Sequence, residues 1–452
     1  MKKRILSALL ALVMVLALLP ATAFAAAPIN GVRYYDKIQT NLKSTDGSPV
    51  GNGWYCQVQV DVGGKKETQY QKLTTGVVTG TSTSGTWYED VNAALAANQA
   101  SFTLLDNQTI SGQLTRNLTV DTNGNTLTIN NADMTKVTSL TVKDSQYAAA
   151  RKAGLSGTPG KVDWDIVNSP SSDGKNTQTF TLTLRDGGCL WGNVDLTNYA
   201  NHTITMTDYA MISGFVTMSG NAANTNAQNV TLTSNCEING MVTLTGNNTR
   251  VSVTSSKLTG GLSLNGTGTQ LTVNGIISKV GAVTLNSAQA KDTGTNATVT
   301  ISQGEVASIT QTSDNLKSPI KITVGENGSV TGATIIDKSA TIIVNQGTMD
   351  AVTLPSGSLT VNGPSARLGA LNLNSIGSTT FKVTGSGNSI ASVTASKGSS
   401  LSVDIAPEPT NTFGNVSLDG YKGHGIKGGT YTGVTVPIAD YLANSGANAL
   451  IY

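Results

Sequence analysis

Charged residues are scarce in this chain of 452 residues: Asp, Glu, Lys and Arg make up 12%, against ~25% in an average globular protein. The 29 basic and 27 acidic residues nearly cancel, which excludes a nucleic-acid partner because phosphate binding needs a basic excess. Aromatic residues make up 5%, and there are two histidines and three cysteines. Such a set leaves little for a zinc site or a histidine-based catalytic triad, so we expect no metal and no cofactor.

A repeated phrase organises the middle of the chain. It consists of an apolar residue, a glycine or another small residue, and an apolar-x-apolar triplet. Its clearest copies span residues 190–196, 212–218, 238–244 and 258–264. Between the copies lie stretches in which apolar residues alternate with Thr or Ser. These stretches include 230–233, 251–254 and 271–274. Such alternation is the period-two pattern of a half-buried strand.

Two or three short strands in each repeat of roughly 20–26 residues, with Gly and Asn at the corners, are typical of one coil of a parallel β-solenoid. Stacked coils place Val on Val and Leu on Leu every ~4.8 Å and so build one continuous narrow core. Glycine and asparagine tolerate the positive φ of tight corners. Because the strict six-residue period of left-handed solenoids is absent, we predict an all-β fold based on a right-handed parallel β-helix over residues 88–436.

The two ends of the predicted solenoid carry recognisable segments. Residues 88–129 read YEDVNAALAANQASFTLLDNQTISGQLTRNLTVDTNGNTLTI, and the other end carries IKGGTY at 426–431 and ADYL at 439–442. These segments resemble the entry segment and the last coil of pectate-lyase-like β-helix proteins of secreted or surface bacterial type. The resemblance implies a short amphipathic helix at about 88–97 with Leu95 directed inward. It implies a fold and not an activity, because this scaffold carries lyases, hydrolases and adhesins alike.

The first 25 residues have the layout of a signal peptide. Residues 2–4 are Lys-Lys-Arg, an apolar run covers 5–19, and Ala-Phe-Ala stands at 23–25. A positive start, a short apolar core and an Ala-x-Ala site indicate a cleaved export signal, and the run is too short for a ~20-residue membrane span. We therefore predict a signal peptide over 1–25, and a mature protein that is secreted or held at the cell surface without a membrane span.

Three further segments complete the predicted organisation. Residues 26–87 are richer in Lys, Tyr and Trp, and an alternating stretch that ends at Gly63-Gly64 predicts a small N-terminal β subdomain. The helix expected before the first coil would cap the open end of the solenoid, where strand edges are unpaired. Residues 130–178 interrupt the rhythm, which we interpret as a loop insertion with a helical turn at 147–152. Residues 437–452 are expected to form a C-terminal cap or tail.

The three cysteines cannot all pair with one another. Cys189 and Cys236 take similar places in two repeats that are not adjacent. Two coils at ~4.8 Å each would hold them ~9.6 Å apart, beyond the ~7 Å between Cα atoms that a disulfide can bridge. We therefore expect both to be buried thiols.

Acidic residues that could catalyse the cleavage of a polysaccharide are few. Of the motifs of β-helix polygalacturonases, Gly-His-Gly at 423–425 is the one that is matched, and it falls in the last coil. A lyase-like calcium site needs clustered acids beside an Arg or Lys. The candidates are Arg185-Asp186, Asp208-Tyr209 and Lys291-Asp292. We expect none of them to form a stack of acids on successive coils, and we interpret them as charges of surface loops.

Aromatic side chains could offer a platform for sugar rings. Trp191, Tyr199 and Tyr209 fall within two coils of each other. Residues 216–380 contain no Phe, Trp or Tyr, so the middle of the rod is a poor carbohydrate groove. The aromatic cluster is either a glycan-binding site or packing beneath the 130–178 segment, and packing is the favoured interpretation.

Three functions follow from these observations. The leading hypothesis is an exported, non-catalytic β-helix protein of the bacterial cell surface with an adhesive or structural role, whose partners would be extracellular glycans or surface proteins. The rival is a polysaccharide lyase or glycoside hydrolase with its catalytic residues at Arg185, Asp186 and Asp208. The third is a glycan-binding module that uses Trp191, Tyr199 and Tyr209.

Overall fold

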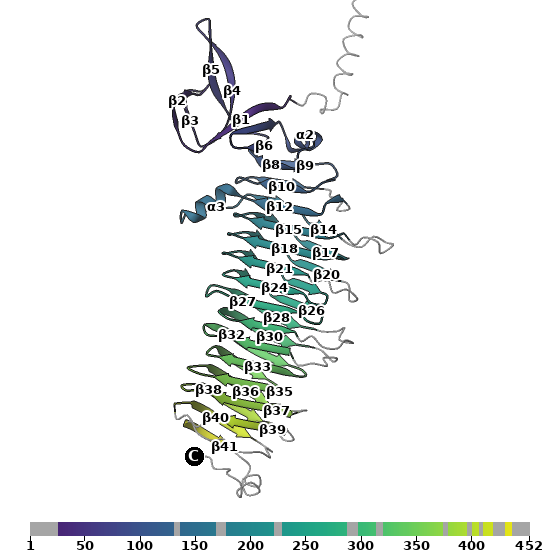
Figure 1. Cartoon of the computed structure of the whole chain (residues 1–452), viewed down its shortest axis with the longest axis vertical. Helices are drawn as coiled ribbons and strands as arrows, with labels where there is room; N and C mark the ends of the chain where they lie inside the picture. The colour runs from purple at the N-terminus through teal and green to yellow at the C-terminus, as the bar shows by residue number, and fades with distance from the viewer. Residues whose placement is uncertain are drawn as a thin grey trace, which may run out of the picture.

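The computed structural model describes residues 26–130, 136–168, 178–220, 228–286, 297–312, 320–373, 378–395, 400–405, 410–418 and 430–435. The protein is all-β, with 60% strand and 4% helix, and its body is a parallel β-solenoid of about 12 turns (Figure 1). The parallel β-helix expected from the repeated phrase is therefore confirmed. The predicted signal peptide at 1–25, the Gly-His-Gly motif at 423–425 and the predicted tail at 437–452 lie outside the described residues.

Successive turns of the solenoid contribute strands to a first parallel sheet. In spatial order its strands are β8 (Ser101–Leu104), β10 (Leu118–Asp121), β12 (Ser139–Lys143), β15 (Phe180–Arg185), β18 (His202–Thr207), β21 (Asn229–Thr233), β24 (Arg250–Thr254), β27 (Gln270–Asn274), β29 (Thr298–Ile301), β31 (Ile320–Val324), β33 (Ala340–Asn345), β35 (Gly357–Asn362), β37 (Ser378–Thr384) and β39 (Ser400–Ile405). The strands pair in register, so Leu182, Ile204 and Val230 form one inward column. The residues that follow them in sequence face outward and are all Thr.

The second sheet is built from the rest of each turn. Its strands are β9 (Gln108–Ile110), β11 (Thr126–Ile129), β13 (Lys161–Asp163), β14 (Ile166–Val167), β16 (Cys189–Trp191), β17 (Val194–Tyr199), β19 (Met211–Ile212), β20 (Val216–Gly220), β22 (Glu237–Ile238), β23 (Val242–Thr245), β25 (Lys257–Leu258), β26 (Leu262–Asn265), β28 (Lys279–Leu285), β30 (Gly304–Gln311), β32 (Gly328–Ile336), β34 (Thr348–Thr353), β36 (Arg367–Leu373), β38 (Ser389–Ala395), β40 (Thr412–Leu418) and β41 (Thr430–Thr435). Early turns supply two short strands with a corner between them. From β28 onward one longer strand takes both places, because β28 pairs with both β25 and β26.

The glycine of the repeated phrase forms the corner between the two short strands. A Cβ added at Gly240 would lie 2.4 Å from the carbonyl oxygen of Gly214, and one added at Gly260 would lie 2.3 Å from the carbonyl carbon of Gly240. Such distances are far below van der Waals contact, because each corner stacks directly on the backbone of the one before. Only a residue without a side chain fits there, which is why the phrase repeats its glycine.

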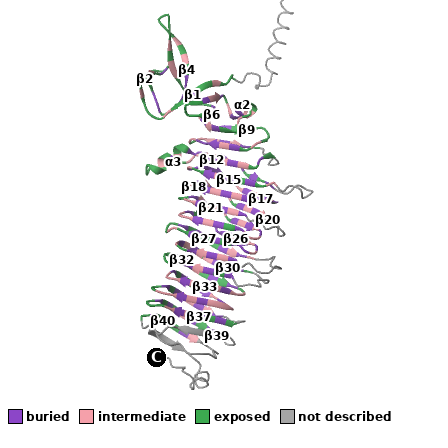
Figure 2. Cartoon of the chain, viewed as in Figure 1, coloured by how far each residue is buried: buried purple, intermediate pink, exposed green. Residues whose placement is uncertain are grey.

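Columns of apolar side chains fill the interior between the two sheets, where Figure 2 shows a continuous buried band. Val194, Val216 and Val242 are register neighbours and all are buried. Each such side chain contributes roughly 1.5–3 kcal/mol when it leaves water. Cys189 and Cys236 are buried free thiols, as expected, and burial raises the pKa of the first to about 12 and of the second to about 11.

The N-terminal subdomain continues the first sheet with antiparallel strands. These are β1 (Ile29–Tyr35), β4 (Gly53–Val62), β5 (Lys65–Leu73), β6 (Val77–Thr81) and β7 (Ser84–Tyr88), while β2 (Gln39–Lys43) and β3 (Pro49–Val50) form a separate pair. The antiparallel order runs β5, β4, β1, β7, β6 and then β8. The predicted small β subdomain is confirmed. One edge of β8 pairs with the parallel strand β10, and the hairpin β6–β7 covers the other edge.

The described residues include two helices, of which α2 (Val91–Ala96) lies at the entrance of the solenoid. The side chain of its N-cap residue Asp90 accepts a hydrogen bond of 2.7 Å from the backbone N–H of Ala93, which satisfies one free donor of the first turn. Val91 and Ala94 are buried and Leu95 is partly buried against the core, so the expected capping helix is present but shorter. Neither helix is long and apolar enough to cross a membrane.

The second helix, α3 (Ser145–Lys152), corrects the interpretation of residues 130–178. Within this segment β12 and β13 pair with the strands before and after them, and β14 pairs with β17 of the next coil. The described residues 136–168 therefore form strands of a coil and are not a loop insertion. The rhythm is hidden in the sequence because α3 and the chain that follows it separate β12 from β13, and because β13 and β14 are only 3 and 2 residues long. The expected helical turn at 147–152 is part of α3.

Candidate functional site

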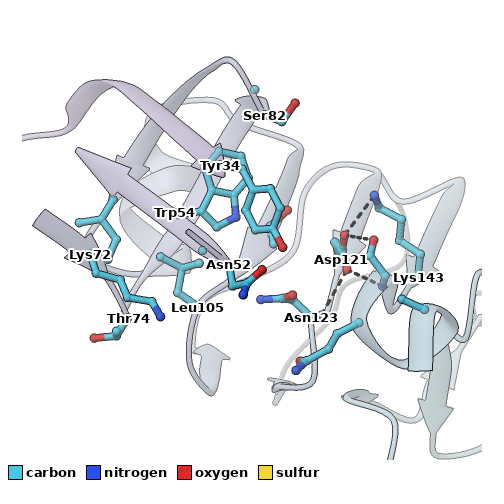
Figure 3. A pocket seen from close by; sticks show the side chains of 17 residues that line it. Tyr34, Asn52, Trp54, Lys72, Thr74, Ser82, Leu105, Asp121, Asn123 and Lys143 are labelled. Carbon is cyan, nitrogen blue, oxygen red and sulfur yellow. Dashed lines mark hydrogen bonds and ion pairs between the residues drawn. The ribbon is translucent and has the colours of Figure 1, made fainter. Parts of the chain in front are cut away.

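A cleft of about 690 Å³ lies where the N-terminal subdomain meets the first coils of the solenoid. We call it the N-terminal cleft. One wall comes from β1, β4 and β5 of the subdomain, and the other comes from β10, β12 and the start of α3 (Figure 3). The cleft therefore brings together segments that are about a hundred residues apart in the sequence.

The subdomain wall carries an aromatic pair, Tyr34 and Trp54. The antiparallel register of β1 and β4 places these two residues opposite each other, and their ring centroids are 5.5 Å apart at an interplanar angle of 60°. Trp54 is 9% exposed and packs in a small core with Val32 and Val78, whereas Tyr34 is 43% exposed. The buried tryptophan thus supports a tyrosine ring that faces the cleft.

The solenoid wall carries a buried carboxylate with a complete set of partners. Asp121 ends β10 and lies 3.1 Å from the Nζ of Lys143, its register neighbour on β12. Its Oδ1 also accepts backbone hydrogen bonds from Ser145, at 3.1 Å, and Asn123, at 3.2 Å, and its Oδ2 accepts one from the Ser145 hydroxyl. Asp121 therefore holds the Lys143 ammonium in place, and that ammonium keeps further N–H donors for a ligand.

Polar side chains complete the lining. Asn52 and Asn123 both have positive φ, 51° and 47°, a left-handed conformation in which asparagine is several-fold enriched. Figure 3 shows both side chains in the space between the aromatic pair and the Asp121–Lys143 pair. On β5, Lys72 lies close to Gly53, where an added Cβ would be 2.9 Å from the Cε of Lys72.

The residues predicted for catalysis lie elsewhere, at one corner of the early coils. Arg185 and Asp186 form an exposed ion pair of 3.3 Å. Asp186 and Asp208 take equivalent places on neighbouring coils, and Asp144 takes the same place on the coil before, since β12, β15 and β18 pair in register up to this corner. The expectation that no acids stack on successive coils is therefore wrong.

The three stacked acids nevertheless have separate roles. The buried carboxylate of Asp144 accepts backbone hydrogen bonds from Tyr147, at 2.9 Å, and Gly160, at 2.6 Å, so it caps α3. Asp186 and Asp208 have φ values of 48° and 53°, as is usual for aspartate at turn positions. Within the described ranges no group of three His, Cys, Asp or Glu side chains could hold a metal ion. The remaining candidate pair, Lys291-Asp292, lies outside them.

The predicted aromatic cluster is spread over two features. Trp191 is 49% exposed, and the Nζ of Lys161 lies 4.5 Å from its ring centroid. The Cζ of Arg151 lies 5.5 Å from the ring centroid of Tyr209. Both cations belong to the coil at 136–168, as the packing interpretation requires. Tyr199 lies in β17, and its side chain is outside the described part of the chain.

A second, smaller hollow of about 260 Å³ lies beside Tyr209 and is also lined by Tyr147, Arg151, Glu237, Lys257 and Ile277. It runs along the outer corner of four coils, and its charged side chains are the acidic Glu237 and the basic Arg151 and Lys257. Its only aromatic face other than Tyr209 comes from Tyr147 of α3. This hollow is smaller than the N-terminal cleft and has no buried charged residue to position its lining.

The single described histidine is part of the interior. His202 is fully buried, its Nδ1 accepts a hydrogen bond of 3.1 Å from the backbone N–H of Phe180, and its Nε2 donates one of 2.6 Å to Asn198. Burial lowers its pKa to about 4. The ring is therefore neutral at pH 7, and both of its nitrogen atoms are already bonded.

Sequence reasoning noticed the aromatic residues of the subdomain but did not place them in a site. The signal was their concentration at 26–87, in contrast to the aromatic-free stretch at 216–380. Comparison of the chain with protein-family models, with curated proteins and with solved structures finds no match. The chemistry of the cleft therefore has to be inferred from its own residues.

Proposed function

We propose that this protein is an exported, non-catalytic rod of the bacterial cell surface with an adhesive role, and that it binds a saccharide in the N-terminal cleft. The observation that carries the proposal is the exposed ring of Tyr34 opposite a set of hydrogen-bonding groups, Asn123 and Lys143. The C–H face of a sugar ring packs on an aromatic ring, and sugar hydroxyls exchange hydrogen bonds with amide and ammonium groups. The cleft offers both kinds of contact across one gap.

The state of the acid in the cleft favours binding over turnover. Glycoside hydrolysis uses two carboxyl groups, one of which gives or takes a proton. Asp121 is the one acidic residue that lines the described cleft, and its oxygens are occupied by Lys143, by the backbone of Asn123 and by Ser145. Its role is to position Lys143, which is a role in recognition.

The solenoid supports an adhesive role by its shape. About 12 turns at ~4.8 Å each make a rod of roughly 58 Å. The N-terminal subdomain and α3, whose residues line the cleft, lie at one end of it (Figure 1). A rigid spacer with its ligand site near the tip holds that site away from the surface to which the other end is attached.

The test is binding of purified residues 26–452 to a glycan array, with Tyr34→Ala and Trp191→Ala as paired variants. We expect the wild type and Trp191→Ala to bind the same glycan and Tyr34→Ala to lose most of the signal. Both residues are exposed aromatics, so each controls for the general loss of a ring. Loss of binding in Trp191→Ala alone would show that the glycan binds at the early coils instead.

The same glycan is then incubated with the protein, and its ends are measured. We expect no new reducing or unsaturated ends after prolonged incubation. Release of such ends by the wild type would overturn the non-catalytic part of the proposal and favour a lyase or hydrolase. Loss of that release on Asp208→Asn would then assign it to the corner of Arg185, Asp186 and Asp208.

A further inference from the structure

We infer that the saccharide bound in the N-terminal cleft carries a carboxylate group, and that Lys72 binds it with help from Lys143. The inference rests on the proposed function, because it names the chemistry of the ligand of that same cleft. It is carried by the charges of the lining and by their positions on the two walls.

The charged residues that line the cleft are Lys72, Asp121 and Lys143. Asp121 and Lys143 form an ion pair of 3.1 Å, and the side chain of Asp121 is 8% exposed. Their charges therefore cancel inside the solenoid wall. Lys72 forms no ion pair within the part of the chain that the structure describes. The cleft thus has one uncompensated positive charge.

The lysines lie on both sides of the aromatic pair. Figure 3 shows Lys72 to one side of Tyr34 and Trp54, and Lys143 on the opposite wall. The stem of Lys72 runs close to Gly53, next to Trp54, so any side chain at position 53 would displace it. A sugar ring stacked on Tyr34 would then lie between two walls that each carry a lysine. A carboxylate on the ring meets one of these lysines in a charge-assisted hydrogen bond, which is stronger than a bond between neutral groups.

The neutral remainder of the lining fits the rest of such a ligand. Asn52 and Asn123 offer amide donors and acceptors, and Ser82 and Thr103 offer hydroxyls. A phosphate monoester, with a charge of about −1.5 to −2 at pH 7, would need denser positive charge than one uncompensated lysine. A single carboxylate on a hydroxyl-rich ring, as in a hexuronic or a sialic acid, matches the charge and the polar groups of this cleft.

The experiment compares matched probes by calorimetry with the mature protein. A hyaluronan hexasaccharide alternates glucuronate with N-acetylglucosamine, its methyl ester removes the charge, and chitohexaose contains N-acetylglucosamine alone. Sialyllactose and lactose form a second pair for the sialic acids. We expect at least one of the two free acids to bind, and its ester or neutral counterpart to bind about tenfold less tightly. The affinity of the acid should also fall as salt is added.

Lys72→Met tests the assignment, because it keeps the stem and removes the charge without touching a buried group. We expect it to weaken binding of the acid about three- to tenfold and to leave binding of the neutral probe unchanged. Lys66→Met is the matched control, since Lys66 is exposed on the same strand and does not line the cleft. Lys143→Arg keeps the partner of Asp121 and should retain binding.

Three results would overturn the inference. Equal affinity for the acid and its neutral counterpart, with loss of binding in Tyr34→Ala, would show that the cleft binds a saccharide without recognising its carboxylate. Equal weakening by Lys66→Met and Lys72→Met would show a general charge effect. Binding of no acidic probe, while neutral glycans bind on the array, would also reject it. If instead no glycan of the array binds, the proposed function fails as well.

Discussion

The outward face of the first sheet is repetitive in the middle of the rod and varied at its N-terminal end. In the middle, Thr205, Thr231 and Ser252 are outward register neighbours on three coils, so each turn displays nearly what the previous turn displays. At the N-terminal end, antiparallel strands place Tyr34 and Lys72 on that same sheet. A stack of similar coils displays the same surface groups in turn after turn. A binding site for one ligand instead needs several different groups brought together at one place.

The side chains that the first sheet directs inward also vary along the rod. The inward column that starts at Phe180 continues through His202, Gln228 and Thr249 in the early coils, and through Ala297, Ile320 and Ala340 in the later ones. The column is polar at four successive positions from His202 to Thr269 and apolar from Ala297 to Ala340, and beyond Gly357 it contains the buried Thr379. Buried polar side chains thus return in the later coils, where Asn388 and Asn411 are also buried.

The glycine corner provides the sharpest test of the comparison. Gly240→Ala forces a Cβ to 2.4 Å from the Gly214 oxygen, and we expect it to lower the free energy of unfolding by about 3 kcal/mol or more. Gly112→Ala, near the N-terminal end, meets nothing within 4 Å and should change stability by less than about 0.5 kcal/mol. Guanidinium unfolding followed by circular dichroism measures both. Equal midpoints for the two variants would contradict the stacking of the corners.

The buried His202 makes the early coils sensitive to pH. Its pKa is about 4 in the folded protein against ~6.5 when unfolded, so the unfolded chain binds more protons between these values. Stability should therefore be complete above pH 6.5 and fall by about 3 kcal/mol as the pH drops towards 4. Urea unfolding at pH 7 and at pH 4.5 checks this.

The matched variant for this experiment is His202→Gln, because the neighbouring coil has Gln228 at the same register position. We expect the variant to lose less stability between pH 7 and pH 4.5 than the wild type loses. An identical loss in both proteins would assign the acid sensitivity to other groups.

The smallest effect is expected for the outward positions in the middle of the rod. Thr231→Val keeps the branched shape on a solvent-facing strand position and should change the free energy of unfolding by less than about 0.5 kcal/mol. Val230→Ala, one residue before it, empties part of the core and should cost about 2 kcal/mol. Thermal unfolding of the two variants side by side gives the answer. A large loss of stability in Thr231→Val would mean that the outward threonines contribute specific interactions, although they repeat from coil to coil.

The solenoid was predictable because its causes are local and repeated. Gly214 and Gly240 recur with the phrase, and Val216 and Val242 recur two residues later, since the same steric and packing needs return in every coil. Where a coil is lengthened by α3 the pattern is lost. That is why the coil at 136–168 and the stacking of Asp144 with Asp186 escaped prediction.

The cleft was not predictable, because its causes are not local. Tyr34 meets Trp54 through the pairing of β1 with β4, and the subdomain meets Asp121 through the pairing of β6 with β8 and of β8 with β10. No short pattern encodes this order of strands. The sequence indicated where aromatic residues are concentrated, and the partners on the opposite wall became visible in the structure alone.

The continuation of the first sheet into the subdomain has a mechanical consequence. The strands lie across the rod and their hydrogen bonds run roughly along its long axis, so a pull on a ligand bound at the tip would load successive interfaces in series. The β6–β8 interface has two paired positions, Val77–Leu104 and Val78–Thr103, whereas β15 and β18 share five. Under tension we expect the tip to peel from the shaft at β6–β8 while the stacked turns stay intact.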